Sequence, residues 1–347
     1  MKIIDINFVP FWAVDADKLA AYCRESGVRK HCLSASRAIK YDVREGNADL
    51  DRREFIAKTT AFAGAALAFG GCVSLSRGCS ERVPYGDTIG DRLWMWGHGA
   101  DALLTGQDNY GLEAERRMDM APACEYMGIR NVCVIRWHGK PEPPFDDCAR
   151  SLSGLKRVAW SITDGSAQTF SEKVDFAFSL SDRMPNLTTF YMDDYFCNNW
   201  KSRRPTSELV DLKSRMQEKG IELACVLYSD QNGFKKEYRP QLALCDEVSC
   251  WFWEGENITG MAERMKACRD FVPAESRLML GLYMWDFGGR KPLPADLMKR
   301  QLDVAGDLIA RGIVNGLIFH CTILCDLGLP AVETARKWIV RHGTDRI

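Results

Sequence analysis

The sequence predicts a single-domain α/β fold, the (β/α)8 or TIM barrel. Eight short apolar runs recur along the chain, and helix-like segments fill most of the gaps between them. The runs are apolar at nearly every position, as is typical of parallel strands buried on both faces. The region from Asp91 to His342 has about 250 residues, the usual size of one such barrel. The predicted strands are Arg92–Trp96, Asn131–Arg136, Arg157–Ile162, Thr188–Met192, Glu222–Leu227, Glu247–Phe252, Leu278–Met284 and Gly316–Phe319.

The residues that end the predicted helices support the same architecture. A glycine follows each predicted helix, as is common at helix ends. These helices are Glu113–Met127, Ser207–Lys219 and Ala295–Arg311. A doubly wound open sheet is the main alternative, and it usually carries a glycine-rich phosphate loop after its first strand. Gly97-His98-Gly99 lacks the spaced third glycine of that loop. The barrel is therefore the favoured fold.

Charge and hydropathy argue against nucleic-acid binding and against a membrane-spanning helix. The formal net charge is −1, so no basic field predicts nucleic-acid binding. No apolar run approaches the roughly 20 residues that span a membrane. Ten tryptophans are many for 347 residues, and most lie in or beside the predicted strands.

Residues 51–72 have the pattern of an export signal. Arg52 and Arg53, followed by a phenylalanine, an aliphatic residue and a lysine, resemble the twin-arginine motif. A weakly apolar run of small residues follows, and it ends at Cys72 in a sequence similar to a lipobox. We expect a twin-arginine translocase as partner, possible membrane anchoring by a lipid on Cys72, and a periplasmic or membrane-anchored location. The alternative is a buried amphipathic helix that happens to carry two arginines.

The position of this signal predicts the domain organisation. About 50 residues precede it, and no methionine lies between Met1 and Met95. We expect residues 1–50 to be disordered or to reflect a misassigned start, with Leu50 as the first native residue. The alternative is a true extension with a short helix at Asp15–Ser26. Residues 73–90 are predicted as a linker and 91–342 as the catalytic barrel.

The cysteines are predicted to be structural. Eleven of the 14 follow Cys72, an odd number that cannot pair completely. Their spacing does not fit a zinc ribbon. Several lie within predicted strands, where a free cysteine behaves as a small buried hydrophobe; these are Cys133, Cys225, Cys250 and Cys321.

Polar and aromatic residues follow the predicted strands directly. The active site of a TIM barrel lies where the strand C-termini meet the following loops, so we expect these side chains to line one pocket. Indole faces suit the C–H faces of sugar rings, and this pattern favours a carbohydrate substrate. The candidate substrate-binding residues are Trp96, His98, Arg136, Trp137, His138, Asp164, Tyr228, Trp253, Trp285 and His320. Trp94 and Trp251 are expected to belong to the core.

Four acids at strand ends are the candidate catalytic residues: Asp193, Asp194, Glu254 and Asp286. Glycoside hydrolysis needs one carboxyl group to protonate the leaving oxygen and a second to attack or to activate water. Glu254 follows Trp253, and loss of hydration beside an indole suits a proton donor. We assign Glu254 as general acid, Asp194 as nucleophile or base, Asp193 as the residue that orients it, and Asp286 as the reserve.

Strand geometry and neighbouring charges leave structural roles open for these acids. Neighbouring strand residues point to opposite faces, so we expect only one of Asp193 and Asp194 to face the barrel mouth. The pair could instead tether a loop. Asp286 could form an ion pair with Arg290 or Lys291.

The barrel region resembles the broad superfamily of TIM-barrel glycosyl hydrolases. Asp193-Asp194-Tyr195-Phe196 is similar to the acidic fourth-strand motif of chitinase-like hydrolases, without their spaced Asp-x-Asp-x-Glu. Acids on strands four and six resemble the α-galactosidase-like clan, although that clan uses aspartate at both places and Glu254 stands at the second here. The resemblance implies an exported glycoside hydrolase.

Two other function classes remain open. His98, His138 and His320 all end strands and could bind a metal with Asp164, Asp194 or Glu254, as in a metal-dependent sugar isomerase, epimerase or lyase. No HxH or HExxH spacing supports that site, so no metal and no cofactor are predicted. A non-catalytic sugar-binding lipoprotein is the third possibility.

Overall fold

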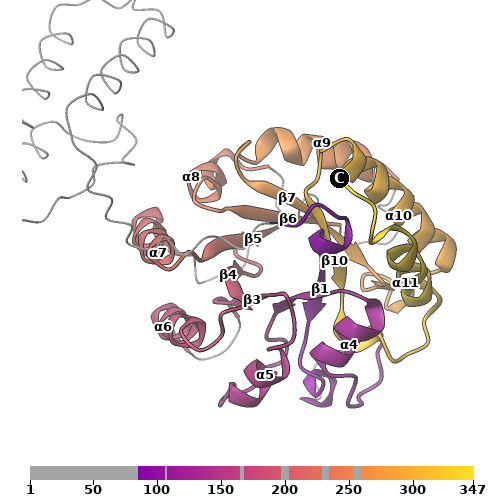
Figure 1. The fold of residues 1–347 in the computed structure, drawn as a ribbon, viewed down its shortest axis with the longest axis horizontal. Coiled ribbons are helices and arrows are strands. Elements are labelled where there is room, and N and C mark those ends of the chain that lie inside the picture. Colours follow the sequence, from indigo (N-terminus) through magenta and orange to yellow (C-terminus); the bar gives the residue numbers. More distant parts are fainter. Residues whose placement is uncertain (1–84, 106–107, 165–167, 197–202, 229–233, 253–258) are drawn as a thin grey trace, which may run out of the picture. The chain divides into compact units, whose positions relative to one another are not determined.

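A computed structural model describes residues 85–105, 108–164, 168–196, 203–228, 234–252 and 259–347. They lie within one compact unit, Ser76–Ile347. Its centre is a closed barrel of eight strands in the order β1-β10-β7-β6-β5-β4-β3-β2, and every neighbouring pair is parallel. Helices surround the strands on the outside (Figure 1). The predicted (β/α)8 barrel is confirmed.

All eight predicted strands are barrel strands. Their bounds are β1 Leu93–Gly97, β2 Asn131–Val134, β3 Arg157–Ser161, β4 Leu187–Met192, β5 Glu222–Tyr228, β6 Glu247–Trp251, β7 Arg277–Tyr283 and β10 Gly316–His320. A two-stranded antiparallel ribbon, β8 Trp285–Asp286 and β9 Lys291–Pro292, follows β7.

The helices complete the repeat. Their bounds are α4 Met120–Met127, α5 Asp146–Ser151, α6 Phe170–Ser181, α7 Thr206–Glu218, α8 Arg239–Leu242, α9 Met261–Phe271, α10 Ala295–Ala310 and α11 Pro330–His342. Four 3-10 turns join them, η1 Gly90–Arg92, η2 Ala102–Thr105, η3 Lys236–Tyr238 and η5 Thr322–Leu324. No helix in these described ranges is long and apolar enough to cross a membrane.

Two of the predicted helices agree with α7 and α10 to within a residue at each end, and the third is too long at its start. Helix α4 begins at Met120, so residues 113–119 are not helical. The amide of Arg117 donates to the Ala100 carbonyl, and the amide of Met118 donates to the Asp326 carboxylate at 2.9 Å. Tertiary partners thus take the backbone donors that an extended helix would use.

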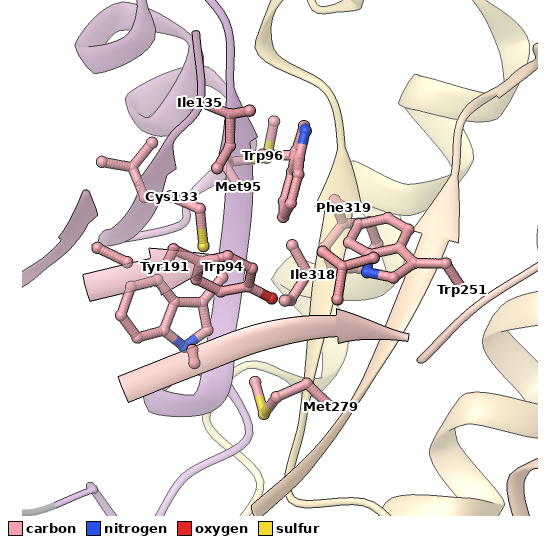
Figure 2. Close-up of a cluster of buried hydrophobic side chains, with 14 of the residues drawn as sticks. Trp94, Met95, Trp96, Cys133, Ile135, Tyr191, Trp251, Met279, Ile318 and Phe319 are labelled. Atoms are coloured by element: carbon pink, nitrogen blue, oxygen red, sulfur yellow. The ribbon is translucent and has the colours of Figure 1, made fainter. Parts of the chain in front are cut away.

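The barrel interior is filled by large side chains from several strands. Figure 2 shows Trp96, Tyr191 and Trp251, which come from β1, β4 and β6, within this core. The Trp96 ring meets Tyr191 edge-on at 5.4 Å and Trp251 at 4.9 Å between centroids. Tyr191 and Trp251 both donate hydrogen bonds to the Ser249 hydroxyl, at 2.6 and 2.7 Å. Polar atoms buried with the rings are thereby satisfied.

Tyr85 closes the N-terminal end of the barrel. Its ring lies between the guanidinium groups of Arg157 and Arg277, at 4.3 and 4.5 Å from the ring centroid. Its hydroxyl donates to Glu247 at 2.8 Å and accepts from the Trp94 indole at 3.1 Å. Arg157, Glu247 and Arg277 begin β3, β6 and β7, which places Tyr85 at the bottom of the barrel. The residue falls within the predicted linker 73–90 and packs on the barrel core.

The chain end lies beside the same segment. Thr88 forms an antiparallel bridge with Arg346, and the amide of Ile347 donates to the Asp87 carbonyl at 3.0 Å. Gly90 and Gly343 approach so closely that a Cβ on Gly90 would lie 2.7 Å from the Gly343 oxygen. Residues before β1 and after α11 therefore hold each other in place.

Candidate functional site

A pocket of about 130 Å³ opens at the C-terminal ends of the barrel strands. Nine of its eleven lining residues carry aromatic rings and the other two are aspartates. The lining residues are Trp96, His98, Tyr110, Trp137, Asp193, Asp194, Tyr228, Trp251, Tyr283, Phe287 and His320. Two carboxylates in an otherwise aromatic enclosure are the chemical signature of the site.

The ring contacts are continuous around the pocket. Tyr110 stacks on Trp137 with centroids 6.2 Å apart, and Trp137 contacts His98 at 5.1 Å. On the other side, Trp251 contacts Tyr283 at 5.4 Å, and Tyr283 contacts Phe287 at 5.6 Å. Rings that support one another in this way give a wall of fixed shape.

Gly281 allows Trp251 to reach the pocket. A Cβ on Gly281 would lie 2.1 Å from Cε3 of the Trp251 ring, which is far inside van der Waals contact. The Trp251 Nε1 atom donates to Ser249 at 2.7 Å and fixes the ring from its other edge. Trp251 is almost fully buried, as expected for a core residue, and it also lines the pocket.

Both Asp193 and Asp194 line the pocket, so the expectation that only one would face the barrel mouth is wrong. Strand β4 ends at Met192, and Asp194 has a positive φ of 51°. Strand alternation does not apply beyond the last strand residue, and the left-handed backbone at Asp194 redirects the second side chain. The Thr163 hydroxyl donates to the Asp193 carbonyl at 2.8 Å and holds this turn against the end of β3.

The carboxyl group of Asp193 has a pKa raised well above its ordinary value. Loss of hydration is the main cause, and the neighbouring charge of Asp194 adds to it. Two carboxylates this close disfavour simultaneous ionisation. Asp193 therefore retains a proton to higher pH than an isolated aspartate, while Asp194 is solvent-exposed.

Burial keeps the two pocket histidines neutral. The pKa of His98 is lowered to about 4, mainly by desolvation. The pKa of His320 is lowered well below its ordinary value by desolvation and by His98. His98 Nδ1 lies 3.2 Å from the Ile135 carbonyl, which can only accept, so this nitrogen carries the hydrogen. Both rings can act as neutral donors, acceptors or metal ligands.

Backbone strain is concentrated around the pocket. Four non-glycine residues of the described ranges have positive φ, and they are Tyr110, His138, Asp194 and Arg290. Tyr110 and Asp194 line the pocket, and His138 directly follows Trp137, which also lines it. Such conformations are costly and persist where the surrounding structure holds a side chain in a required place.

The structure brings half of the fourteen predicted catalytic and substrate-binding residues together. Seven of the predicted substrate-binding and catalytic residues line the one pocket, and these are Trp96, His98, Trp137, Asp193, Asp194, Tyr228 and His320. Trp253 and Glu254, the predicted general acid, lie outside the described residues. So do Arg52, Arg53 and Cys72 of the predicted export signal.

Arg136 and Asp164 lie beside the pocket in an ion-pair network. Arg136 Nη1 is 3.2 Å from Asp164 Oδ2, and Lys173 Nζ is 2.8 Å from Asp164 Oδ1. The three side chains are at most 10% exposed. They join the loop after β2, the loop after β3 and helix α6.

Three further predicted residues are not among the lining residues. His138 Nδ1 lies 3.0 Å from the Ala102 carbonyl. The Trp285 indole donates to the Tyr110 carbonyl at 3.1 Å and supports a lining residue from behind. The Asp286 carboxylate accepts from the Gly289 amide at 2.8 Å, which closes the β8–β9 turn. Neither ion pair considered for Asp286, with Arg290 or with Lys291, is formed among the described residues, and Arg290 pairs with Asp108 at 2.6 Å.

Sequence reasoning missed Tyr110, Tyr283 and Phe287 as pocket residues, and it placed Trp251 in the core alone. Tyr283 is the last residue of β7, so the strand-end rule could have found it. Tyr110 and Phe287 come from loops after β1 and β8, where no strand pattern marks them. Only the folded loops reveal these two.

Comparisons with known proteins identify no family. Neither protein-family models nor curated proteins match the sequence. Among solved structures, concanavalin B has a TM-score of 0.46 at 13% identity, over 71% of this chain and 98% of its own. A family GH18 chitinase from the fern Peteris ryukyuensis has a TM-score of 0.43 at 13% identity, with the same coverage. An alpha-L-arabinofuranosidase from Thermotoga maritima has a TM-score of 0.47 at 11% identity, over 74% and 71% of the two chains. At these values the similarity carries no argument about function, which must come from the pocket.

Proposed function

We propose that this protein is a glycoside hydrolase that cleaves a carbohydrate substrate in the aromatic pocket. The observation that carries the proposal is the pair Asp193–Asp194 lining a pocket whose other walls are aromatic rings. Aromatic faces suit sugar rings, and hydrolysis of a glycosidic bond needs carboxyl groups in two protonation states. The pocket offers one carboxyl group that retains its proton and one that is exposed.

The roles of the acids follow from their surroundings. Asp194 acts as nucleophile or base, and Asp193, whose pKa is raised, orients Asp194 by accepting a hydrogen bond from the Asp194 backbone amide. Glu254 supplies the proton to the leaving oxygen. It follows strand β6, whose last residue, Trp251, lines the pocket. The neutral histidines His98 and His320 contact sugar hydroxyl groups.

Screening tests the proposal most directly. Purified protein should release sugar from at least one member of a panel of aryl glycosides and polysaccharides. Asp194→Asn should reduce turnover by about 100-fold or more, because an amide neither attacks nor accepts a proton. Asp211→Asn is the matched control, since this aspartate of α7 is exposed and does not line the pocket. Sugar binding without turnover would instead favour a non-catalytic binding protein.

We also propose that the protein is exported by the twin-arginine route and anchored by a lipid on Cys72. The twin arginines, the short apolar run and the lipobox-like end support this location. Fractionation of the native host should recover the protein with the membrane, and Arg52→Lys with Arg53→Lys should retain it in the cytoplasm.

A further inference from the structure

We propose that His98, His320 and Cys321 form a binding site for a thiophilic metal ion, of the class of Zn²⁺ or Cu⁺, in the wall of the pocket. Each residue offers one ligand atom, and these atoms all lie within 4.8 Å of one another. The residues come from the ends of two neighbouring strands, since Trp96 of β1 is paired with His320 of β10. This inference goes beyond the proposed hydrolysis, because it assigns His98 and His320 to a metal ion where the proposed function has them contact sugar hydroxyl groups.

His98 is prepared for metal binding by its backbone partner. Its Nδ1–H faces the Ile135 carbonyl at 3.2 Å, which leaves Nε2 unprotonated and able to coordinate. Metal-binding histidines commonly donate their other ring N–H to a backbone carbonyl in this way. Thr322 fixes the backbone: it accepts from the His98 amide at 3.0 Å and donates to the His98 carbonyl at 3.2 Å.

His320 has a buried nitrogen that no described residue satisfies. Its Nδ1 has no hydrogen-bond partner among the described residues. Leaving a buried polar atom unpaired costs free energy, and a metal ion would remove that cost. The ring is held by Phe287 at 4.8 Å, Tyr283 at 5.0 Å and Trp96 at 6.0 Å. His320 is therefore fixed in place without being hydrogen-bonded through that nitrogen.

Cys321 supplies the third ligand and determines the class of ion. Its thiol is buried and free. Coordination replaces the S–H bond with an S–metal bond and releases one proton to solvent, with no change of oxidation state. Two imidazoles and one thiolate select Zn²⁺ or Cu⁺ over Mg²⁺ or Ca²⁺, which prefer oxygen ligands.

The three ligand atoms must move closer together to coordinate one metal ion. Zn²⁺ bonds of about 2.0–2.3 Å place tetrahedral ligand atoms about 3.3–3.8 Å apart, so the three side chains would close by about 1 Å. His98 and His320 line the pocket and Cys321 does not. A Zn²⁺ ion with three protein ligands keeps a fourth position for water or another small ligand, which would be reached from the pocket.

Co²⁺ is the spectroscopic probe, because it replaces Zn²⁺ and reports thiolate ligation by charge-transfer absorption. The full-length protein, reduced and stripped of metal, should bind about one Co²⁺ with this absorption and lose it when Zn²⁺ is added. Cys321→Ser should abolish the charge-transfer band, and His320→Asn should weaken Co²⁺ binding at least 10-fold. Cys268→Ser is the control, because this buried cysteine of α9 is outside the cluster.

Two results would overturn the site. One is a charge-transfer band that persists in Cys321→Ser, which would place the metal on other cysteines. The other is the absence of any binding of Co²⁺, Zn²⁺ or Cu⁺ by wild-type protein whose circular dichroism shows it to be folded. Zn²⁺ and Cu⁺ are each titrated against the metal-free protein. Tighter binding of either ion supports the site and identifies the ion that it prefers. Since binding is measured without a sugar, failure here leaves the proposed hydrolysis untouched.

Discussion

Gly281 and Trp251 are in contact across neighbouring strands, with the indole occupying the space that a Cβ on residue 281 would need. The nearest ring atom, Cε3, would be 2.1 Å from that Cβ. The rings of Trp96 and Tyr283 close the other sides of Trp251 at 4.9 and 5.4 Å. One wall of the pocket therefore depends on the absence of a side chain.

Gly281→Ala should displace Trp251 and enlarge or distort the pocket. Overpacking of a well-packed core costs about 1–3 kcal/mol, so the free energy of unfolding should fall by this amount. KM for the substrate should rise more than kcat falls, because Trp251 lines the pocket and has no proton to transfer in hydrolysis. Gly154→Ala is the control, since nothing lies within 4 Å of its added Cβ. Unchanged KM with normal stability would show that Trp251 does not shape the site.

Asp193→Asn should stabilise the protein increasingly as pH rises. The pKa of Asp193 is higher in the folded than in the unfolded chain, because of desolvation and then Asp194. Its contribution to stability is complete below its ordinary pKa of 3.8 and is lost as pH rises through the folded value. Asparagine cannot ionise and avoids this loss. Tm measured from acid to neutral pH should show a widening gap between variant and wild type.

Asp211→Asn, an exposed change on α7, should leave the pH profile of Tm unchanged. A gap between Asp193→Asn and wild type that narrows as pH rises would contradict the protonated state assigned to Asp193.

Replacement of each acid should lower kcat by an amount that depends on the role of that acid. Glu254→Gln and Asp194→Asn should each lower kcat by about 100-fold or more. Asp193→Asn should lower it less, because the amide oxygen can still accept the hydrogen bond from the Asp194 backbone amide. If Glu254→Gln retains near-normal turnover, the general acid is misassigned and Asp286 is the next residue to test.

Tyr85 should control stability without affecting catalysis. Tyr85→Phe keeps the ring beside Arg157 and Arg277 but removes the hydroxyl that donates to Glu247 and accepts from the Trp94 indole. Glu247 keeps the hydrogen bond from Arg277 Nε at 3.3 Å, and the indole loses its partner, which should cost about 1–3 kcal/mol. Tyr85→Ala also removes the buried ring and should cost about 3–5 kcal/mol. Urea unfolding gives these values, and kcat/KM of the folded fraction should remain at the wild-type value. A large loss of turnover in folded Tyr85→Phe would contradict the separation of the two barrel ends.

After signal cleavage, the mature N-terminus should be at Cys72. Signal cleavage at a lipobox leaves the cysteine first and acylated. Mass spectrometry of protein purified from its host should find a lipid-modified peptide beginning at Cys72, and Cys72→Ala should abolish the modification. Recovery of peptides from residues 1–48 in the mature protein would disprove both the cleavage and the misassigned start.

The barrel was predictable because its strands are apolar throughout, a pattern that follows from burial on both faces. The same logic located Trp96, His98, Tyr228 and His320, since parallel strands deliver their last residues to one face. This rule does not identify residues that reach the pocket from loops. Tyr110 reaches the pocket from a loop, and Asp194 turns toward it because of a positive φ that the sequence does not display.

An ion pair between Arg136 and an acid is compatible with the sequence, because Arg136 and Asp164 both follow strand ends. The sequence did not indicate that Asp164 is the partner or that Lys173 of α6 joins the pair, since the three residues come from different segments. The cluster of His98, His320 and Cys321 was missed for the same reason, because its members are joined by strand pairing and have no motif spacing.

The position of Tyr85 also determines which end of the barrel a lipid on Cys72 would be connected to. Twelve residues separate Cys72 from Tyr85, a length of chain that spans at most about 45 Å. Because Tyr85 is fixed at the bottom of the barrel, the lipid would pull on the face opposite the pocket. Such a tether would therefore join the barrel at the end opposite the strand C-termini, where the pocket opens.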